Sequence, residues 1–119
     1  MSAGAGPGPE AGTGALLVVL ADAVPGREEE FDLWYDTVHI PELLRLPGWE
    51  SATRYERAPE LEVPGAERFA CLYELSGDPA AALAAFEADR PNRTATAAMA
   101  AAARVLYRPY RPTRRENDD

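Results

Sequence analysis

The stretch FDLWYDTVHIPELLRLPGWESATRY, residues 31–55, holds the helix, turn and strand from which the fold can be worked out. Its apolar residues recur at helical spacing, at Phe31, Trp34, Tyr35 and Val38. Pro41 has no backbone N–H and disfavours helical dihedrals at the residue before it. We therefore expect a helix to about His39, a break or kink there, and a short helical turn over residues 41–46 that ends before Pro47-Gly48.

The residues after this turn alternate in polarity from Trp49 to Arg57, which is typical of a strand. The expected faces are Trp49, Ser51, Thr53 and Tyr55 on one side, and Glu50, Ala52, Arg54 and Glu56 on the other. Because Arg54 and Tyr55 fall on opposite faces, only one of them can point into a given cavity.

The segments on either side of this stretch predict further elements. Ala15–Ala21 (ALLVVLA) is a short aliphatic run typical of a strand covered on both faces, and residues 68–75 (RFACLYEL) predict a third strand. Asp78-Pro79 pairs a capping residue with a proline at the first helical position, so an alanine-rich helix should begin there and run through Asp89. The sequence thus continues the pattern of strands and helices beyond the quoted stretch.

The last part of the chain predicts a second helical stretch, capped by Thr94 and ending near Arg104, and then a strand from Arg104 to Tyr110. The order is then βαββαβ, the ferredoxin-like α+β fold with a four-stranded antiparallel sheet and two helices on one face. We expect one domain over residues 15–111, between a flexible leader (1–14) and a flexible tail (112–119). Apolar residues on both strand faces favour a homodimer, in which a second copy covers the face without helices.

Composition excludes several classes of function. The chain has 119 residues and a net charge of -8, and its basic side chains are all arginine. Without lysine, Schiff-base chemistry and a phosphate-binding loop of the GxxxxGK type are excluded. His39 and Cys71 are the single histidine and cysteine, too few for a protein-only zinc site or an internal disulfide. The acidic charge opposes nucleic-acid binding, and no apolar run reaches the length of a membrane span. We expect a cytoplasmic protein that binds a small-molecule substrate, with no cofactor and no nucleic-acid or membrane partner.

The quoted stretch resembles a pattern of the dimeric α+β barrel superfamily, and most closely its EthD-like proteins. In these a W-x(3,4)-H-[IVL]-P helix leads to a PG turn and a strand ending in RY. The matching residues are Trp34, His39, Ile40, Pro41, Pro47, Gly48, Arg54 and Tyr55. The superfamily also includes cofactor-independent monooxygenases, muconolactone isomerase, polyketide cyclases and haem-degrading enzymes. The resemblance implies a barrel-shaped dimer with a pocket between the sheet and the first helix of each subunit, and it leaves the reaction open.

The candidate catalytic residues gather around His39, whose side chain is expected to titrate near neutrality. At a helix break, unsatisfied carbonyl groups would favour its imidazolium form. Tyr35 and Asp36 can share its helix face and orient it by hydrogen bonding, and Arg54 could stabilise a developing oxyanion. The candidate substrate-binding residues form an aromatic wall suited to a flat apolar ligand: Trp34, Trp49, Tyr55, Phe69 and Tyr73.

Each of these assignments has a structural alternative. His39 could cap the helix end by bonding a carbonyl group, the aromatic residues could be plain core, and Arg54 or Arg68 could belong to an exposed ion-pair face. Cys71 is expected to be a small buried hydrophobic residue.

The leading functional hypothesis is a small cofactor-independent acid/base enzyme of specialised metabolism or catabolism. It would act on a cyclic, aromatic or polyketide-like molecule as a cyclase, isomerase, dehydratase or decarboxylase. The alternatives are a cofactor-independent monooxygenase in the same pocket, a non-catalytic dimer that binds a small ligand, and a haem protein with His39 as proximal ligand.

Overall fold

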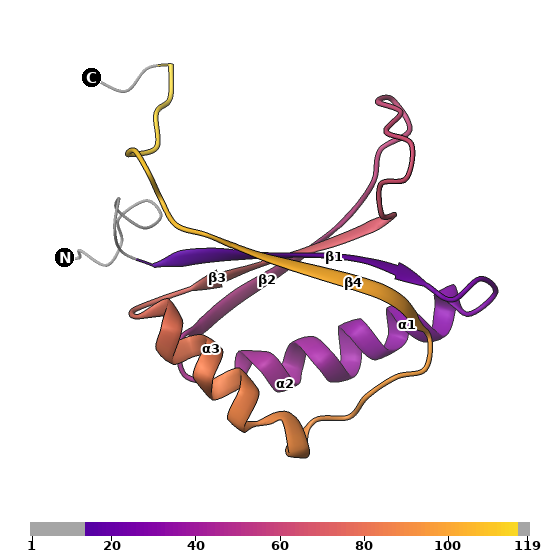
Figure 1. The fold of residues 1–119 in the computed structure, drawn as a ribbon, viewed down its shortest axis with the longest axis horizontal. Helices are drawn as coiled ribbons and strands as arrows, with labels where there is room; N and C mark the ends of the chain where they lie inside the picture. The colour runs from indigo at the N-terminus through magenta and orange to yellow at the C-terminus, as the bar shows by residue number, and fades with distance from the viewer. Residues whose placement is uncertain (1–13, 117–119) are drawn as a thin grey trace.

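The computed structural model describes residues 14–116, which form a four-stranded antiparallel sheet with helices on one face (Figure 1). The strands, in spatial order, are β2 (Trp49–Glu56), β3 (Phe69–Leu75), β1 (Ala15–Ala23) and β4 (Met99–Tyr107). The helical segments are α1 (Glu28–Trp34), the π-helical turn η1 (Tyr35–His39), α2 (Ile40–Leu44), α3 (Pro79–Ala88) and the 3-10 turn η2 (Arg90–Asn92). This is the expected α+β fold with ferredoxin-like order. The expected leader, apart from Gly14, and the last three residues of the expected tail lie outside the described residues.

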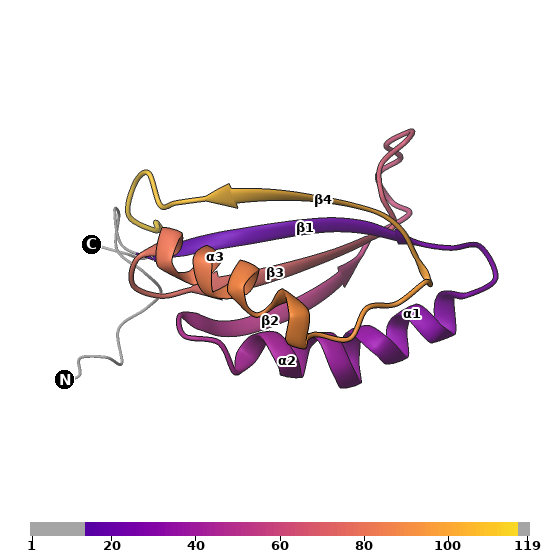
Figure 2. The same cartoon turned by 60° about the horizontal axis from the view of Figure 1, so that its bottom comes forward.

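The core lies between the sheet and the helices, which Figure 2 shows gathered on one side of the strands. Alternate residues of the two central strands point into it and are buried: Ala15, Leu17, Val19 and Ala21 on β1, and Phe69, Cys71, Tyr73 and Leu75 on β3. The helices contribute Phe31, Tyr35 and Leu43. As expected, Cys71 is a buried free thiol.

A register shift near the start of β2 changes the expected faces of that strand. Trp49 lies opposite Leu75 and Arg54 opposite Cys71, with an irregularity in the ladder between Trp49 and Ser51. Because residues directly opposite each other share a face, Trp49 and Arg54 both point toward the helices. Tyr55 points to the other side. The simple alternation expected from the sequence, which placed Trp49 with Tyr55, is therefore wrong at Trp49.

The helix from Glu28 to Leu44 does not break before Pro41. Ile40 has helical dihedrals (φ -60, ψ -48), and its N–H donates to the carbonyl oxygen of Tyr35, five residues earlier. The wider π-helical turn places Pro41 in the first turn of α2, where the missing N–H is tolerated. The expected break is thus replaced by a π-helical turn, which is often found at functional sites.

The end of the chain differs from expectation over its alanine-rich segment. Asp78 caps α3 as expected, since its side chain accepts from the N–H of Ala80 at 3.0 Å. The expected helix from Thr94 to Arg104 is absent, and β4 begins at Met99 and pairs antiparallel with β1. Pairing satisfies the backbone groups of β1 along its outer side, which outweighs the helical preference of alanine. Among the helices of residues 14–116, none has the length and apolar character needed to cross a bilayer.

Candidate functional site

A cavity of about 190 Å³ opens between the helix-covered face of the sheet and the helices. Four of the residues expected at the site line it, namely Tyr35, His39, Trp49 and Tyr73. The rest of the wall is mainly apolar and comes from the strands, α2 and α3: Leu17, Val19, Leu43, Phe86, Met99, Ala102 and Arg104. The cavity therefore offers one titratable imidazole to an apolar and aromatic space.

The π-helical turn presents both Tyr35 and His39 to the cavity, because residues four apart lie on one side of a helix. The His39 ring stacks on Trp34 at 4.4 Å between centroids and meets the edge of Tyr35 at 5.1 Å. Trp34 is itself fixed, since its indole N–H donates to the carbonyl oxygen of Thr94 at 2.8 Å. Ring packing thus sets the orientation of His39.

The His39 imidazole forms no hydrogen bond or ion pair with any other residue in the 14–116 range. The carbonyl bond of the capping alternative is therefore absent from this part of the chain. Asp36 does not orient the ring either, because its carboxylate is bound to Arg54 at 3.2 Å. The nitrogen atoms of His39 remain available to a ligand.

Burial, as the main cause, and the positive charges of Arg93 and Arg104 together lower the pKa of His39 from 6.5 to about 4. The imidazolium form expected from a helix end is therefore disfavoured, because the helix continues through this residue and burial opposes the charged form. At neutral pH the ring is neutral and keeps a free lone pair. It can act as a base.

Two buried phenols lie on the cavity wall near this base. The hydroxyl of Tyr73 donates to that of Tyr35 over 3.5 Å, at the long limit of a hydrogen bond. Burial raises the pKa of Tyr35 to about 12, and burial raises the pKa of Tyr73 as well. Both hydroxyls stay protonated at neutral pH. The Tyr73 proton is used in the bond to Tyr35, so the Tyr35 hydroxyl is the one that can donate to a negatively charged oxygen in the cavity.

Arg54, the expected oxyanion group, does not line this cavity. Its guanidinium pairs with Asp32 at 2.9 Å and with Asp36 at 3.2 Å, and lies 4.8 Å from the ring centroid of Tyr35. Burial opposes its charge, but the hydrogen bonds to the two carboxylates outweigh burial and raise the pKa of Arg54. The structure thus joins Arg54 to Asp32 and Asp36, and none of these three residues lines the cavity that His39 borders.

The remaining aromatic residues predicted for the site do not all lie at the cavity. Trp34 stacks on the His39 ring, and Phe69 packs against Phe31 with centroids 5.3 Å apart. Neither residue lines the cavity. Tyr55 is 54% exposed on the opposite face of the sheet. Trp49 lines the cavity with its indole N–H held by the carbonyl oxygen of Ala82 at 3.0 Å.

Sequence reasoning missed Phe86, Met99 and Arg104 as cavity residues. Met99 and Arg104 lie in the segment expected to be helical, and Phe86 is a single aromatic residue within an alanine-rich helix. Arg104 lies opposite Val19 and Ala102 opposite Ala21, so both are placed on the cavity side only by the pairing of β4 with β1. A strand assignment for residues 99–107 could have pointed to Arg104.

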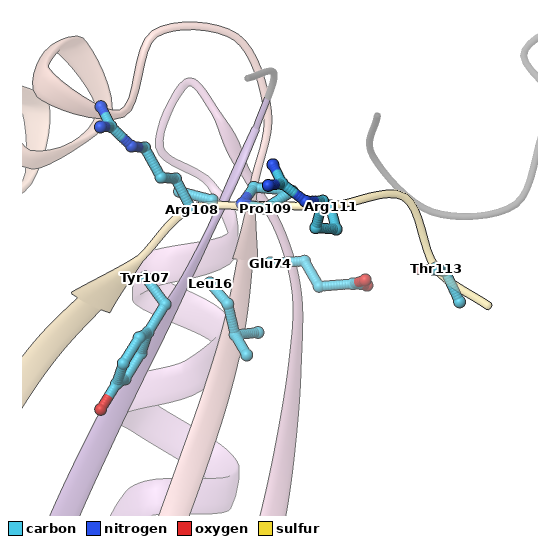
Figure 3. A pocket seen from close by; sticks show the side chains of 8 residues that line it. Leu16, Glu74, Tyr107, Arg108, Pro109, Arg111 and Thr113 are labelled. Atoms are coloured by element: carbon cyan, nitrogen blue, oxygen red, sulfur yellow. The ribbon is translucent and has the colours of Figure 1, made fainter. Parts of the chain in front are cut away.

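A second depression, of about 320 Å³, lies at the start of β1 and beside the segment that follows β4 (Figure 3). It contains none of the expected site residues. Figure 3 shows the Arg108 side chain extending away from Glu74 and Thr113. Within the described range no three His, Cys, Asp or Glu side chains gather in a way that could hold a metal ion.

Comparisons with models of known protein families, with curated proteins and with solved structures find no match to this chain.

Proposed function

We propose that the protein is a small acid/base enzyme that needs no cofactor and acts on a cyclic, aromatic or polyketide-like molecule. The observation that carries this proposal is the neutral imidazole of His39, which has no hydrogen-bond partner in the described chain and borders an apolar cavity. A half-buried base in such a space can reach a ligand's acidic proton with less competition from bulk water than an exposed one.

The proposed chemistry is a proton transfer next to a carbonyl group. His39 takes a proton from a carbon beside the carbonyl, and the electron pair of the C–H bond moves to the carbonyl oxygen to form an enolate. The phenol of Tyr35 stabilises that oxygen by donating a hydrogen bond, and Tyr73 supports it by donating to the Tyr35 oxygen. The imidazolium then returns the proton at another carbon, which gives an isomer, or to a leaving hydroxyl, which gives dehydration. This places the Tyr35 phenol in the role that the sequence had suggested for Arg54.

The volume of the cavity limits the size of the substrate. At about 190 Å³ it is smaller than the roughly 300–1,000 Å³ common for sites that hold drug-sized ligands. The aromatic wall of Trp49, Tyr73 and Phe86 favours a flat molecule. We therefore propose a substrate with about one ring.

The test uses cyclohex-3-enone, whose isomerisation to the conjugated cyclohex-2-enone is followed by ultraviolet absorbance. The C2 proton is removed to form a dienolate, and protonation at C4 completes the reaction. We expect the wild type to accelerate it and His39→Gln to lose about 100-fold or more of that acceleration. Asp36→Asn is the matched control, since Asp36 lies on the same helix outside the cavity and should retain the rate. Equal rates for wild type and His39→Gln would refute His39 as the base.

Oxygen consumption in the same assay distinguishes the monooxygenase alternative. Uptake of O₂ in step with substrate loss would show that a deprotonated substrate reacts with oxygen in this cavity. Binding of a ligand that the protein does not convert would instead support the alternative of a non-catalytic binding module.

We also propose that two copies form a homodimer through the face of the sheet without helices. That face carries apolar residues on β3, β1 and β4, because Val18 lies opposite both Leu72 and Val105, and Leu16 lies opposite Tyr107. Val105 and Tyr107 are 43% and 54% exposed in the single chain. Covering these residues with a second copy removes apolar surface from water. The free thiol of Cys71 suits the cytoplasm as the proposed location.

A further inference from the structure

The cavity holds one charged side chain, and it is positive. Arg104 is the only Asp, Glu, Lys or Arg among the described residues that line it, although the chain as a whole has a net charge of -8. None of the described carboxylates lines the cavity, although Glu87, which pairs with Arg90, interacts electrostatically with Arg104 from outside it. A cavity with this charge balance favours an anion over a neutral molecule.

Arg104 is also free to bind. Its guanidinium lies 5.3 Å from the ring centroid of Phe86, and it has no ion pair or hydrogen bond with another residue between 14 and 116. Arg93 lies 3.9 Å from the centroid of the same ring, but its guanidinium is already used, since it donates to the carbonyl oxygen of Phe86 and to the Asp89 carboxylate. The two arginines thus differ in role, with Arg93 fixed and Arg104 available.

The position of Arg104 relative to the base sets the geometry of a bound ligand. Arg104 comes from β4 and His39 from the π-helical turn, so they reach the same cavity from the sheet and from the helix layer. Trp49 and Phe86 stack with centroids 5.6 Å apart and form an aromatic part of the wall. A ring lying in the cavity can therefore have one substituent at Arg104 and another position at His39.

We propose that the substrate is a ring carboxylate whose carboxylate group is bound by Arg104, which orients the ring with its acidic position toward His39. This rests on the proposed function for the role of His39, but the binding itself does not. A planar guanidinium can bind a carboxylate through two parallel hydrogen bonds, which fixes orientation as well as affinity. Arg104 would then determine specificity, and His39 would carry out the proton transfer.

A carboxylate bound at Arg104 would also change the pKa of His39. The positive charges near His39 come from Arg93 and Arg104, while the other titratable groups on the cavity wall, Tyr35 and Tyr73, are neutral phenols at neutral pH. An anion at Arg104 offsets part of that positive charge. The pKa of His39 should therefore rise when the ligand binds, which makes the imidazole a stronger base with the substrate in place.

The test compares benzoate with benzamide, which has nearly the same shape and no charge, by titration of the full chain followed by NMR. The indole N–H signal of Trp49 reports occupancy of the cavity. We expect benzoate to bind the wild type at least tenfold more tightly than benzamide, and Arg104→Gln to remove that difference while leaving benzamide binding unchanged. Arg104→Lys should restore part of it, because the charge remains.

Arg108→Gln is the matched control, since Arg108 follows the same strand but lines the other depression (Figure 3). It should bind benzoate as the wild type does. Equal binding of benzoate and benzamide to the wild type, or an equal loss in Arg104→Gln and Arg108→Gln, would overturn the proposal. The enone assay has an uncharged substrate, so it can fail while benzoate still binds through Arg104, or succeed while benzoate shows no preference. The two proposals are therefore tested separately.

Discussion

At the scale of single residues, the protonation state of His39 follows from its surroundings rather than from its residue type. An exposed histidine titrates near 6.5, whereas here burial and two nearby arginines bring the pKa to about 4. The ring is held between Trp34 and the edge of Tyr35 without a hydrogen bond from the rest of the described chain. Its position is thus set by packing, and its charge by exclusion from water.

This shift in pKa makes stability depend on pH. His39 binds a proton at higher pH in the unfolded chain than in the folded one, so its contribution is neutral above pH 6.5 and destabilising as the pH falls toward 4. A difference of this size corresponds to at most about 3 kcal/mol of unfolding free energy. We predict that the free energy of unfolding falls less between pH 7 and pH 4 in His39→Gln than in the wild type. Urea denaturation at each pH measures this free energy. The carboxylates titrate in both proteins, so an identical pH dependence would contradict the prediction.

At the scale of elements, Arg54 ties β2 to the helix that carries His39. Its side chain is 19% exposed, pairs with Asp32 and Asp36, and lies among the rings of Phe31, Tyr35 and Phe69. These contacts connect the strand to both α1 and the π-helical turn. Arg54 is therefore expected to position the helix without touching a ligand.

We predict that Arg54→Ala lowers the unfolding free energy by about 2 kcal/mol, because it removes two ion pairs and the packing of a mostly buried guanidinium against three aromatic rings. Arg68→Ala is the control. Arg68 also pairs with a carboxylate, that of Glu56, and lies over Phe69, but its side chain is 49% exposed. Its loss should cost less than about 1 kcal/mol. Chemical denaturation measures the unfolding free energy of both variants. An equal loss in Arg54→Ala and Arg68→Ala would show that the burial of Arg54 does not add to stability.

The elements also show how far sequence reasoning reaches. The β1 strand, the hairpin strands β2 and β3 and the Asp78 cap of α3 could be predicted, because each depends on residues that are neighbours in the chain. The bulge after Trp49, the π-helical turn before Pro41 and the strand at Met99–Tyr107 could not, because each is decided by packing or pairing with another element. The same reason explains the site. Tyr35 and His39 lie on one helix, so their spacing in the sequence predicted that they share a side. Arg104 reaches the cavity only because β4 pairs with β1, which the sequence did not predict.

At the scale of the whole molecule, the helices pack against one face of the sheet (Figure 2). The other face has apolar residues that are still partly exposed. Val18 lies at the centre of the second face, opposite both Leu72 and Val105. We predict that the wild type sediments as a dimer and that Val18→Lys shifts it to monomer, because a buried lysine in the contact would lack a partner. Leu33→Lys is the control, since Leu33 is 63% exposed on α1 and should leave the dimer intact. A monomeric wild type at micromolar concentration would contradict the dimer.

The central claim is that His39 is a neutral, half-buried base on the wall of a mainly apolar cavity, and an NMR pH titration of its imidazole tests this most directly. The chain has one histidine, so one set of ring signals reports it without assignment by mutation. We predict a midpoint near pH 4 in the free protein. A midpoint at or above 6.5 would show a ring open to water or stabilised as imidazolium, and it would contradict the claim.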